Sequence, residues 1–304
     1  MDVGLAFPQM TPDLDRDRVR AWCRAVDDGP FSSISAGERV AFDNLDGFTL
    51  CTAAAALTDR VRIGFNVVVA PWHAPAMLAK ELASIDVLSG GRVDVAVGVG
   101  GREQDYVALG SPSTNRFQRL DDTVAELRRL WAGGEVVPGA TVGPVPVQDG
   151  GPPLLCSGTG PKSLARAARW ADGLTGFTLA ADPAEAGANF RLAEAAWTDA
   201  GRTTSPRRVT GSFAVLGPGA ENALHAFARR YLDVFGSGVA AWLTERMPLS
   251  SPDALRAFLL GLATEGCDEV VLVPGRSDPD QVRRFAEVVD SIRDELGATA
   301  GSAP

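Results

Sequence analysis

The sequence predicts an α/β protein folded as a single (β/α)₈ barrel of the TIM type. Strand-like and helix-like segments alternate almost throughout, eight such pairs can be counted, and 304 residues fit a closed barrel with insertions. A doubly wound open sheet is the alternative. Such sheets usually carry a glycine-containing phosphate loop after the first strand, whereas FPQMTPDLD (7–15) contains no glycine. The barrel is therefore the expected fold, over residues 1–296.

Eight segments rich in β-branched and other apolar residues are the predicted strands. They are 2–7, 31–36, 61–69, 92–100, 152–158, 172–178, 207–217 and 267–275. Several are apolar at successive positions, as expected when helices cover one side of a strand and a packed interior the other. In RVDVAVGVG (92–100), valines alternate with small residues, and the strand ends in glycines where a sheet normally carries side chains.

Helical periodicity fills the connections between the strands. One predicted face holds Val19, Trp22, Cys23 and Val26, and another holds Leu120, Val124, Leu127, Leu130 and Trp131. Further helices are predicted near 47–58, 75–88, 161–171, 183–200, 221–235, 252–265 and 279–296. Insertions follow the fourth and seventh strands: 132–151 is expected as a surface excursion, with a hairpin as one form, and 236–251 as a lid-like loop. The tail, 297–304, is expected to be disordered.

Composition excludes several classes of protein. The net charge is −9 and the basic residues are scattered, which argues against nucleic acid and anionic membrane surfaces. No 18-residue apolar stretch is present, and MDVGLAFPQM lacks the basic region of a signal peptide. The four cysteines stand far apart and are expected to be buried free thiols, so we expect a reduced, cytoplasmic protein. With only His73 and His225, a metal site built on several histidines is excluded.

Candidate site residues follow the predicted strands, because a barrel places its chemistry at the carboxyl ends of its strands. Ser157, Gly158, Thr159 and Gly160 precede a helix beginning at Pro161, an arrangement that suits a phosphate but equally an ordinary helix N-cap. Gly98 and Gly100 would let a flat ligand approach the backbone, or they serve tight packing inside the barrel. His73, in PWHAP, is a candidate for the active site or for a capping or surface position.

Three stretches resemble the bacterial luciferase-like superfamily, which holds flavin-dependent monooxygenases and F420-dependent oxidoreductases. They are RIGFNVVVAPWHAPAMLAKELASIDVLSGGRVDVAVGVGGREQDYVALG (62–110), R-x-x-R-L-D-D…LRRLW (116–131) and PLLCSGTGPKSLARAARWADGL (153–174). The resemblance implies a (β/α)₈ barrel with reduced FMN or F420 across the strand ends. It assigns Gly98, Gly100 and Arg102 to the cofactor, Ser157 to Gly160 to its phosphate, and Asn66-Val67 to a cis peptide beneath its ring.

The sequence departs from the family pattern at two positions. Arg39 stands where luciferases have a catalytic histidine, and Val99 stands where they have a phosphate-binding arginine, with Arg102 three residues later. Glu38 and Arg39 are candidates to orient substrate or stabilise charge, and His73 to move a proton. The alternative for Glu38 and Arg39 is a salt-bridged barrel rim.

The predicted function is therefore an oxidoreductase acting on a small, partly apolar organic substrate. It would use reduced FMN with O₂, or F420 for hydride transfer, and a separate reductase and a homodimer are further expectations. Phe7, Phe177 and Trp242 are expected in the substrate pocket. One alternative is a non-catalytic luciferase-like partner subunit. A barrel hydrolase or lyase is a third hypothesis, ranked last because Lys80 and Lys162 both lie in helical segments.

Overall fold

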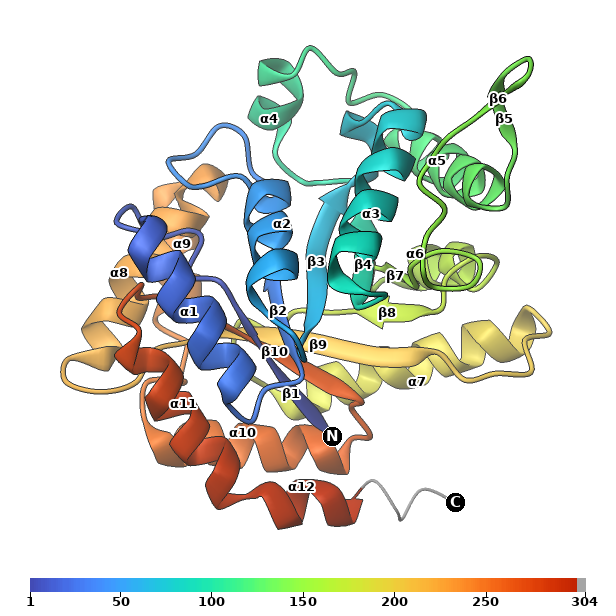
Figure 1. Cartoon of the computed structure of the whole chain (residues 1–304). Coiled ribbons are helices and arrows are strands. Elements are labelled where there is room, and N and C mark those ends of the chain that lie inside the picture. Colours follow the sequence, from blue (N-terminus) through green and yellow to red (C-terminus); the bar gives the residue numbers. More distant parts are fainter. Residues whose placement is uncertain (300–304) are drawn as a thin grey trace.

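The computed structural model describes residues 1–299 and contains a closed barrel of eight parallel strands (Figure 1), which confirms the predicted fold. In order around the barrel the strands are β1 (Asp2–Ala6), β10 (Glu269–Pro274), β9 (Arg207–Ala214), β8 (Gly173–Thr175), β7 (Leu154–Cys156), β4 (Val93–Gly98), β3 (Arg62–Val69) and β2 (Ser33–Ala36). Each lies inside a segment predicted to be a strand.

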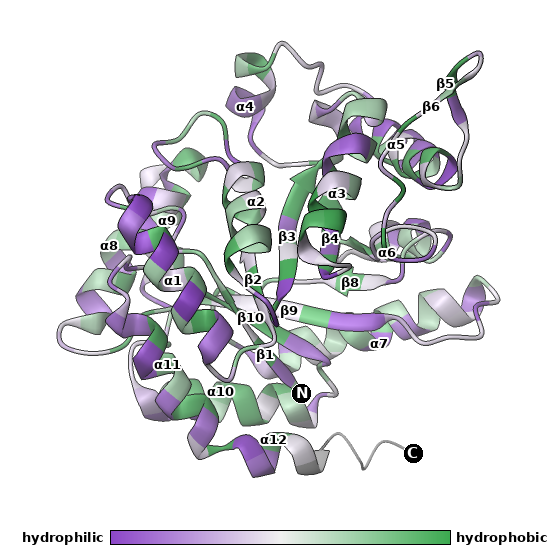
Figure 2. Ribbon diagram, in the orientation of Figure 1, coloured by the Kyte–Doolittle hydropathy of each residue, from purple (hydrophilic) through white to green (hydrophobic). Residues whose placement is uncertain are grey.

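Helices cover the outside of the barrel (Figure 1). They are α1 (Arg16–Asp28), α2 (Gly47–Leu57), η1 (Ala70–Trp72), α3 (Pro75–Ser89), α4 (Glu103–Ala108), α5 (Arg116–Trp131), α6 (Pro161–Ala167), α7 (Pro183–Asp199), α8 (Ala220–Leu232), η2 (Asp233–Phe235), α9 (Ser237–Thr244), α10 (Pro252–Thr264), α11 (Asp280–Ser291) and α12 (Arg293–Thr299). The two faces predicted from periodicity, on α1 and α5, are buried at every named position. Figure 2 shows the hydrophilic and hydrophobic stripes that alternate along α1 and α11.

The structure differs from the predicted elements in several places. Helix α4 was not predicted, because its six residues are too few to show a period, although acidic residues in its first turn favour a helix there. The predicted helix 279–296 is broken at Ile292 into α11 and α12. Residues 297–299 continue α12 where the sequence predicts the start of a disordered tail, and 300–304 lie outside the described residues.

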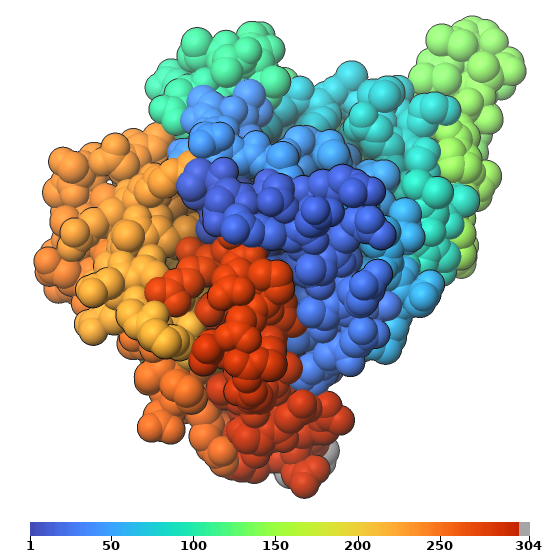
Figure 3. All heavy atoms as spheres, turned by 60° about the vertical axis from the view of Figure 1, so that its left-hand side comes forward, coloured from blue at the N-terminus to red at the C-terminus, as the bar shows by residue number. Residues whose placement is uncertain are grey.

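Both regions predicted as insertions contain short secondary-structure elements. In 132–151, β5 (Glu135–Val137) and β6 (Ala140–Thr141) form a small antiparallel hairpin that projects from the barrel (Figure 1). In 236–251, where the sequence predicts a loop, Ser237–Thr244 form helix α9, directly after η2. At the other side of the fold, the C-terminal segment lies directly against the N-terminal segment (Figure 3), as β1 pairs with β10 to close the barrel.

Side chains inside the barrel form three layers, because every second residue of a strand faces inward. On β4 the inward positions are Asp94, Ala96 and Gly98, while Val93, Val95 and Val97 are buried on the outward side beneath helices. Asp94 belongs to a charged layer at the amino ends of the strands, and Ala96 packs with Leu155, Val209 and Val271 in an apolar middle layer. Gly98 faces a cavity at the carboxyl ends. The small residues of the β4 pattern therefore line the interior.

Two further expectations concern the whole chain. All four cysteines are free and buried, as predicted. Within residues 1–299, the structure contains no helix with the length and hydropathy needed to span a bilayer.

Candidate active site

A cavity of about 540 Å³ opens at the carboxyl ends of the barrel strands. This volume lies within the range of sites that bind small molecules and cofactors. All eight barrel strands contribute to its lining, with Ala6, Ser35, Val67, Gly98, Cys156, Thr175, Phe213 and Val273 as one residue from each. The cavity is therefore the place where the predicted site residues must meet if they act together.

The peptide bond between Asn66 and Val67 is cis, as the family resemblance predicts, and both residues line the cavity. The pairing register between β3 and β4 shifts between Asn66 and Val68. The loop after β2 passes directly against this bond, since a Cβ on Gly37 would lie 2.5 Å from the carbonyl oxygen of Asn66. Only a glycine at position 37 allows this close approach.

The glycines at the end of β4 have distinct structural reasons. A Cβ on Gly98 would lie 2.3 Å from the Ser157 Oγ, so a side chain there would force the Ser157 hydroxyl out of its position. Gly100 has a φ of 65°, a left-handed conformation that glycine adopts without strain. Both residues line the cavity, together with Gly101. The missing side chains thus serve close packing against Ser157 and, at the same time, leave bare backbone on the cavity wall.

The turn from Ser157 to Gly160 connects β7 to α6. Ser157 and Gly158 line the cavity, whereas Thr159 and Gly160 complete the turn without lining it. The backbone N–H groups of Thr159 and Gly160 donate no hydrogen bond to any residue between 1 and 299, in contrast to that of Ser157, which donates to Val97 O at 3.0 Å. The turn therefore holds free donors next to the cavity.

Glu38 and His73 form a hydrogen-bonded ion pair at the cavity wall. The Glu38 Oε1 lies 2.8 Å from the His73 Nε2, and its Oε2 accepts from the Val69 N–H at 2.6 Å. Burial alone would lower the pKa of His73, but the hydrogen bond and the negative charge of Glu38 outweigh it and raise that pKa above its usual value. Glu38 lines the cavity and His73 lies behind it. The pair can hold a proton within reach of a bound molecule.

Arg39 and Arg102 meet over one aromatic ring, that of Tyr231 on α8. The Cζ of Arg102 lies 4.8 Å from the ring centroid, and that of Arg39 lies 5.1 Å from it. Arg39 is buried, and its Nη1 donates to the Tyr231 carbonyl at 3.3 Å. Arg102 lines the cavity. The alternative of a salt-bridged rim fits Glu38, which pairs with His73, but not Arg39, which pairs with no carboxylate in the described part of the chain.

Sequence reasoning missed several residues of the cavity wall. Tyr231 on α8 and Phe213 on β9 both line the cavity. Each lies at a position in its helix or strand where a core residue is expected, so the sequence does not distinguish them from residues of the core. Asp105 could have been found from the sequence, because it is a charged residue just beyond a glycine-rich strand end. It is buried, and its Oδ1 accepts hydrogen bonds from the Val40 and Ala41 N–H groups at 3.2 and 2.6 Å. Its helix, α4, was itself unpredicted.

Of the three aromatic residues predicted for the substrate pocket, two line the cavity and one does not. Phe7 and Phe177 are part of the wall. The prediction for Trp242 is wrong: its residue is 55% exposed on α9, where Arg246 stacks on the ring. The sequence predicts a loop at Trp242, and an aromatic residue in a loop does not indicate which side faces the barrel. The direction of the Trp242 side chain is set by helix α9, which the sequence did not predict.

Comparisons with known proteins agree with this geometry. A family model described as luciferase-like monooxygenase matches residues 5–255. The chain is 30% identical over 167 residues to the oxygenase component of flavin-dependent trigonelline monooxygenase from Acinetobacter baylyi, covering 51% of this chain and 46% of that protein. The chain spans about half the length of the curated relatives it matches.

Solved structures share the fold along almost the whole chain. Monooxygenase RslO1 from Streptomyces bottropensis superposes with a TM-score of 0.79 at 22% identity, covering 96% of this chain and 100% of that one. An F420-dependent secondary alcohol dehydrogenase, solved with an F420-acetone adduct, gives 0.76 at 20% identity, covering 96% and 99%. The family match confirms the resemblance seen in residues 62–131 and 153–174. This chain belongs to the luciferase-like monooxygenase family.

Proposed function

We propose that this chain is a flavin-dependent monooxygenase that uses reduced FMN and O₂ to oxidise a small, partly apolar organic molecule. The observation that carries the proposal is the convergence of three features on one cavity: the cis Asn66–Val67 peptide, the bare backbone at Gly98, and the hydroxyl-bearing turn at Ser157. A planar ring system would rest on the first two features and its phosphate on the third. The family match and the trigonelline monooxygenase relative support a flavin.

The residues present fit such a cofactor. The cavity has room for a ring system, and the hydroxyls of Ser157 and Thr159, with the free N–H groups of Thr159 and Gly160, provide donors for a phosphate. When bound, reduced FMN supplies the electrons that activate O₂. The protein supplies orientation and shelter from water, which the apolar wall containing Phe177 and Phe213 provides.

Glu38 and His73 are the proposed acid–base pair. Glu38 reaches the cavity, and His73 holds a proton against it at 2.8 Å. The Val69 N–H fixes the second carboxylate oxygen, so the pair has one orientation in which a proton can pass to or from a bound substrate. Arg39 stands one residue further along the loop but faces Tyr231 instead of this pair.

A separate flavin reductase is the proposed partner. The relative from Acinetobacter is itself an oxygenase component, which supports a separate protein that supplies the reduced flavin. The homodimer and the cytoplasmic location stay predictions, and sedimentation of the purified protein would measure the first.

The test is a fluorescence titration of the protein with FMN and with F420, each in oxidised and reduced form. We expect reduced FMN to bind tightly and F420 weakly. The double variant S157A/T159A should bind FMN at least tenfold more weakly, since hydrogen bonds to a charged group contribute about 1.5–3 kcal/mol each. T198A removes one hydroxyl from the exposed face of α7 and should leave binding unchanged.

Each other outcome has a defined meaning. Tight binding of F420 alone would replace the flavin proposal with F420-dependent hydride transfer. If neither cofactor binds and the protein turns over no substrate, the result favours the non-catalytic partner subunit. Unchanged FMN affinity in S157A/T159A would show that the phosphate of FMN does not bind at the turn after β7.

A further inference from the structure

Two neighbouring arginines, Arg102 in the cavity wall and Arg39 buried beside it, form no ion pair within the described range 1–299. Arg102 makes no hydrogen bond and no ion pair with any residue in the described range 1–299, and its Nε is buried without an acceptor. Arg39 is only 8% exposed, its Nε is also buried without an acceptor, and its one hydrogen bond goes to a neutral carbonyl. By contrast Arg166, the other arginine of the wall, pairs with Asp121 at 2.7 Å.

The two positive charges also oppose each other. Burial, followed by the charge of Arg102, lowers the pKa of Arg39 to about 10. The charge of Asp105 attracts Arg39, but its Oδ1 accepts from two backbone N–H groups, its Oδ2 has no hydrogen-bond partner in the described range, and it makes no ion pair with either arginine. A buried charge without a partner is costly. An anion bound to Arg102 in the cavity would reduce that cost.

The surroundings of these arginines are aromatic. Arg102 also lies 5.6 Å from the centroid of Phe235, and Tyr231 packs edge-on against Phe213 at 5.4 Å. Phe213 in turn contacts Phe177 at 4.7 Å, and both line the cavity. Arg102 follows β4, which lies between β7 and β3 in the barrel, but its guanidinium packs on Tyr231 of α8 and on Phe235 of η2, both of which follow β9. The Arg102 guanidinium thus lies beside the aromatic side chains, away from the turn after β7 that the proposed phosphate would occupy.

We propose that Arg102, supported by Arg39, binds the carboxylate of the substrate, and that the substrate is a small aromatic or alicyclic carboxylic acid. The guanidinium of Arg102 can pair with a carboxylate through two hydrogen bonds, while the ring of the acid packs on Phe177 and Phe213. The inference rests on the proposed function and changes the role that the family resemblance gives to Arg102, from the cofactor to the substrate.

The experiment measures the binding of matched probes to the FMN-loaded protein by calorimetry: benzoate, phenylacetate and cyclohexanecarboxylate, each beside its neutral amide. We expect at least one acid to bind tenfold or more tightly than its amide. R102Q should abolish this preference without changing the affinity for FMN, and R102K should restore part of it, because lysine keeps the charge but not the planar fork. R246Q, which removes an arginine stacked on Trp242 outside the cavity, is the matched control.

Other results would overturn the inference. If R102Q weakens FMN or F420 instead of the acids, the two arginines serve the anionic part of the cofactor. If no acid is preferred over its amide, or R102Q and R246Q behave alike, the arginines only close the cavity mouth. Failure of FMN itself to bind the wild-type protein would contradict the proposed function, and is thereby distinguished from failure of the carboxylate site.

Discussion

Glu38 is the residue on which the protonation state of the site depends. Its carboxylate holds His73 at 2.8 Å and raises the histidine pKa against the effect of burial. We predict that E38Q lowers the pKa of His73, measured by NMR titration in an H225Q background that leaves one histidine signal. E81Q is the control: Glu81 acts on His73 only through its charge, so its loss should lower the pKa less.

The same pair makes stability depend on pH. Because the pKa of His73 is raised on folding, its contribution is complete below about pH 6.5, the unfolded value, and is lost as the pH rises through the folded pKa. The stability difference between wild type and E38Q should therefore be largest in acid and shrink toward alkaline pH. A difference that grows with pH would contradict the assignment.

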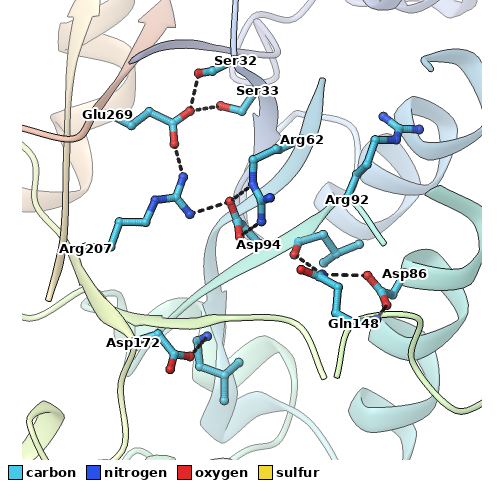
Figure 4. Close-up of polar contacts among 12 residues, drawn as sticks. Ser32, Ser33, Arg62, Asp86, Arg92, Asp94, Gln148, Asp172, Arg207 and Glu269 are labelled. Carbon is cyan, nitrogen blue, oxygen red and sulfur yellow. Dashed lines mark hydrogen bonds and ion pairs between the residues drawn. The ribbon is translucent and has the colours of Figure 1, made fainter. Parts of the chain in front are cut away.

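At the scale of elements, Asp86 attaches the insertion 132–151 to α3. This buried carboxylate accepts from the Val147 and Gln148 N–H groups at 2.7 and 3.0 Å and from the Gln148 side chain at 2.8 Å (Figure 4). Gln148 also donates to Val93 O at 2.7 Å, at the start of β4. The hairpin insertion is thus anchored to the barrel at its C-terminal side.

We predict that D86A destabilises the fold by about 2 kcal/mol, because three donors lose a buried acceptor. Amide hydrogen exchange at Val147 and Gln148 should accelerate, while exchange in β4 changes little. D122A, on the exposed face of α5 where Asp122 accepts one bond from Gln118, should have little effect on either measurement. Equal effects of the two variants would show that Asp86 does not anchor the insertion.

At the scale of the whole molecule, the two ends of the barrel have separate tasks. Opposite the cavity, Arg207 bridges Asp94 at 2.7 Å and Glu269 at 2.5 Å, and Arg62 pairs with Asp94 from β3 (Figure 4). Ser32 and Ser33 donate to Glu269 at 2.7 and 2.6 Å. Burial opposes the charge of Arg207, but the two carboxylates outweigh it and raise its pKa. This cluster closes the amino-terminal end of the barrel.

We predict that R207M destabilises the protein by about 3 kcal/mol, since it leaves buried carboxylates short of a partner. Urea unfolding would measure the loss, and FMN affinity should stay unchanged because the cluster lies at the far end of the barrel from the cavity. R283M is the control: Arg283 pairs with Glu287 on the exposed face of α11, where solvent screens the pair and its loss should change stability little. Loss of FMN binding in folded R207M would show that the two ends are coupled.

Local patterns were sufficient for most of the elements. The eight strands and the buried faces of α1 and α5 follow from alternation and helical period, which arise from backbone geometry alone. Helix α4 was not predicted because its six residues are too few to show a helical period. Trp242 was wrongly assigned to the pocket because the hydrophobicity of a residue does not tell which way its side chain points.

The amino-acid sequence by itself determined the barrel, the family, and the segments whose ends meet around one cavity, because each rests on a pattern within a few tens of residues. Only the tertiary structure decided which side chains act together. Arg39 bonds to Tyr231 across 192 positions, and His73 reaches Glu38 across 35. Such partners are brought together by the closure of the barrel, and neither residue carries a local sign of the other.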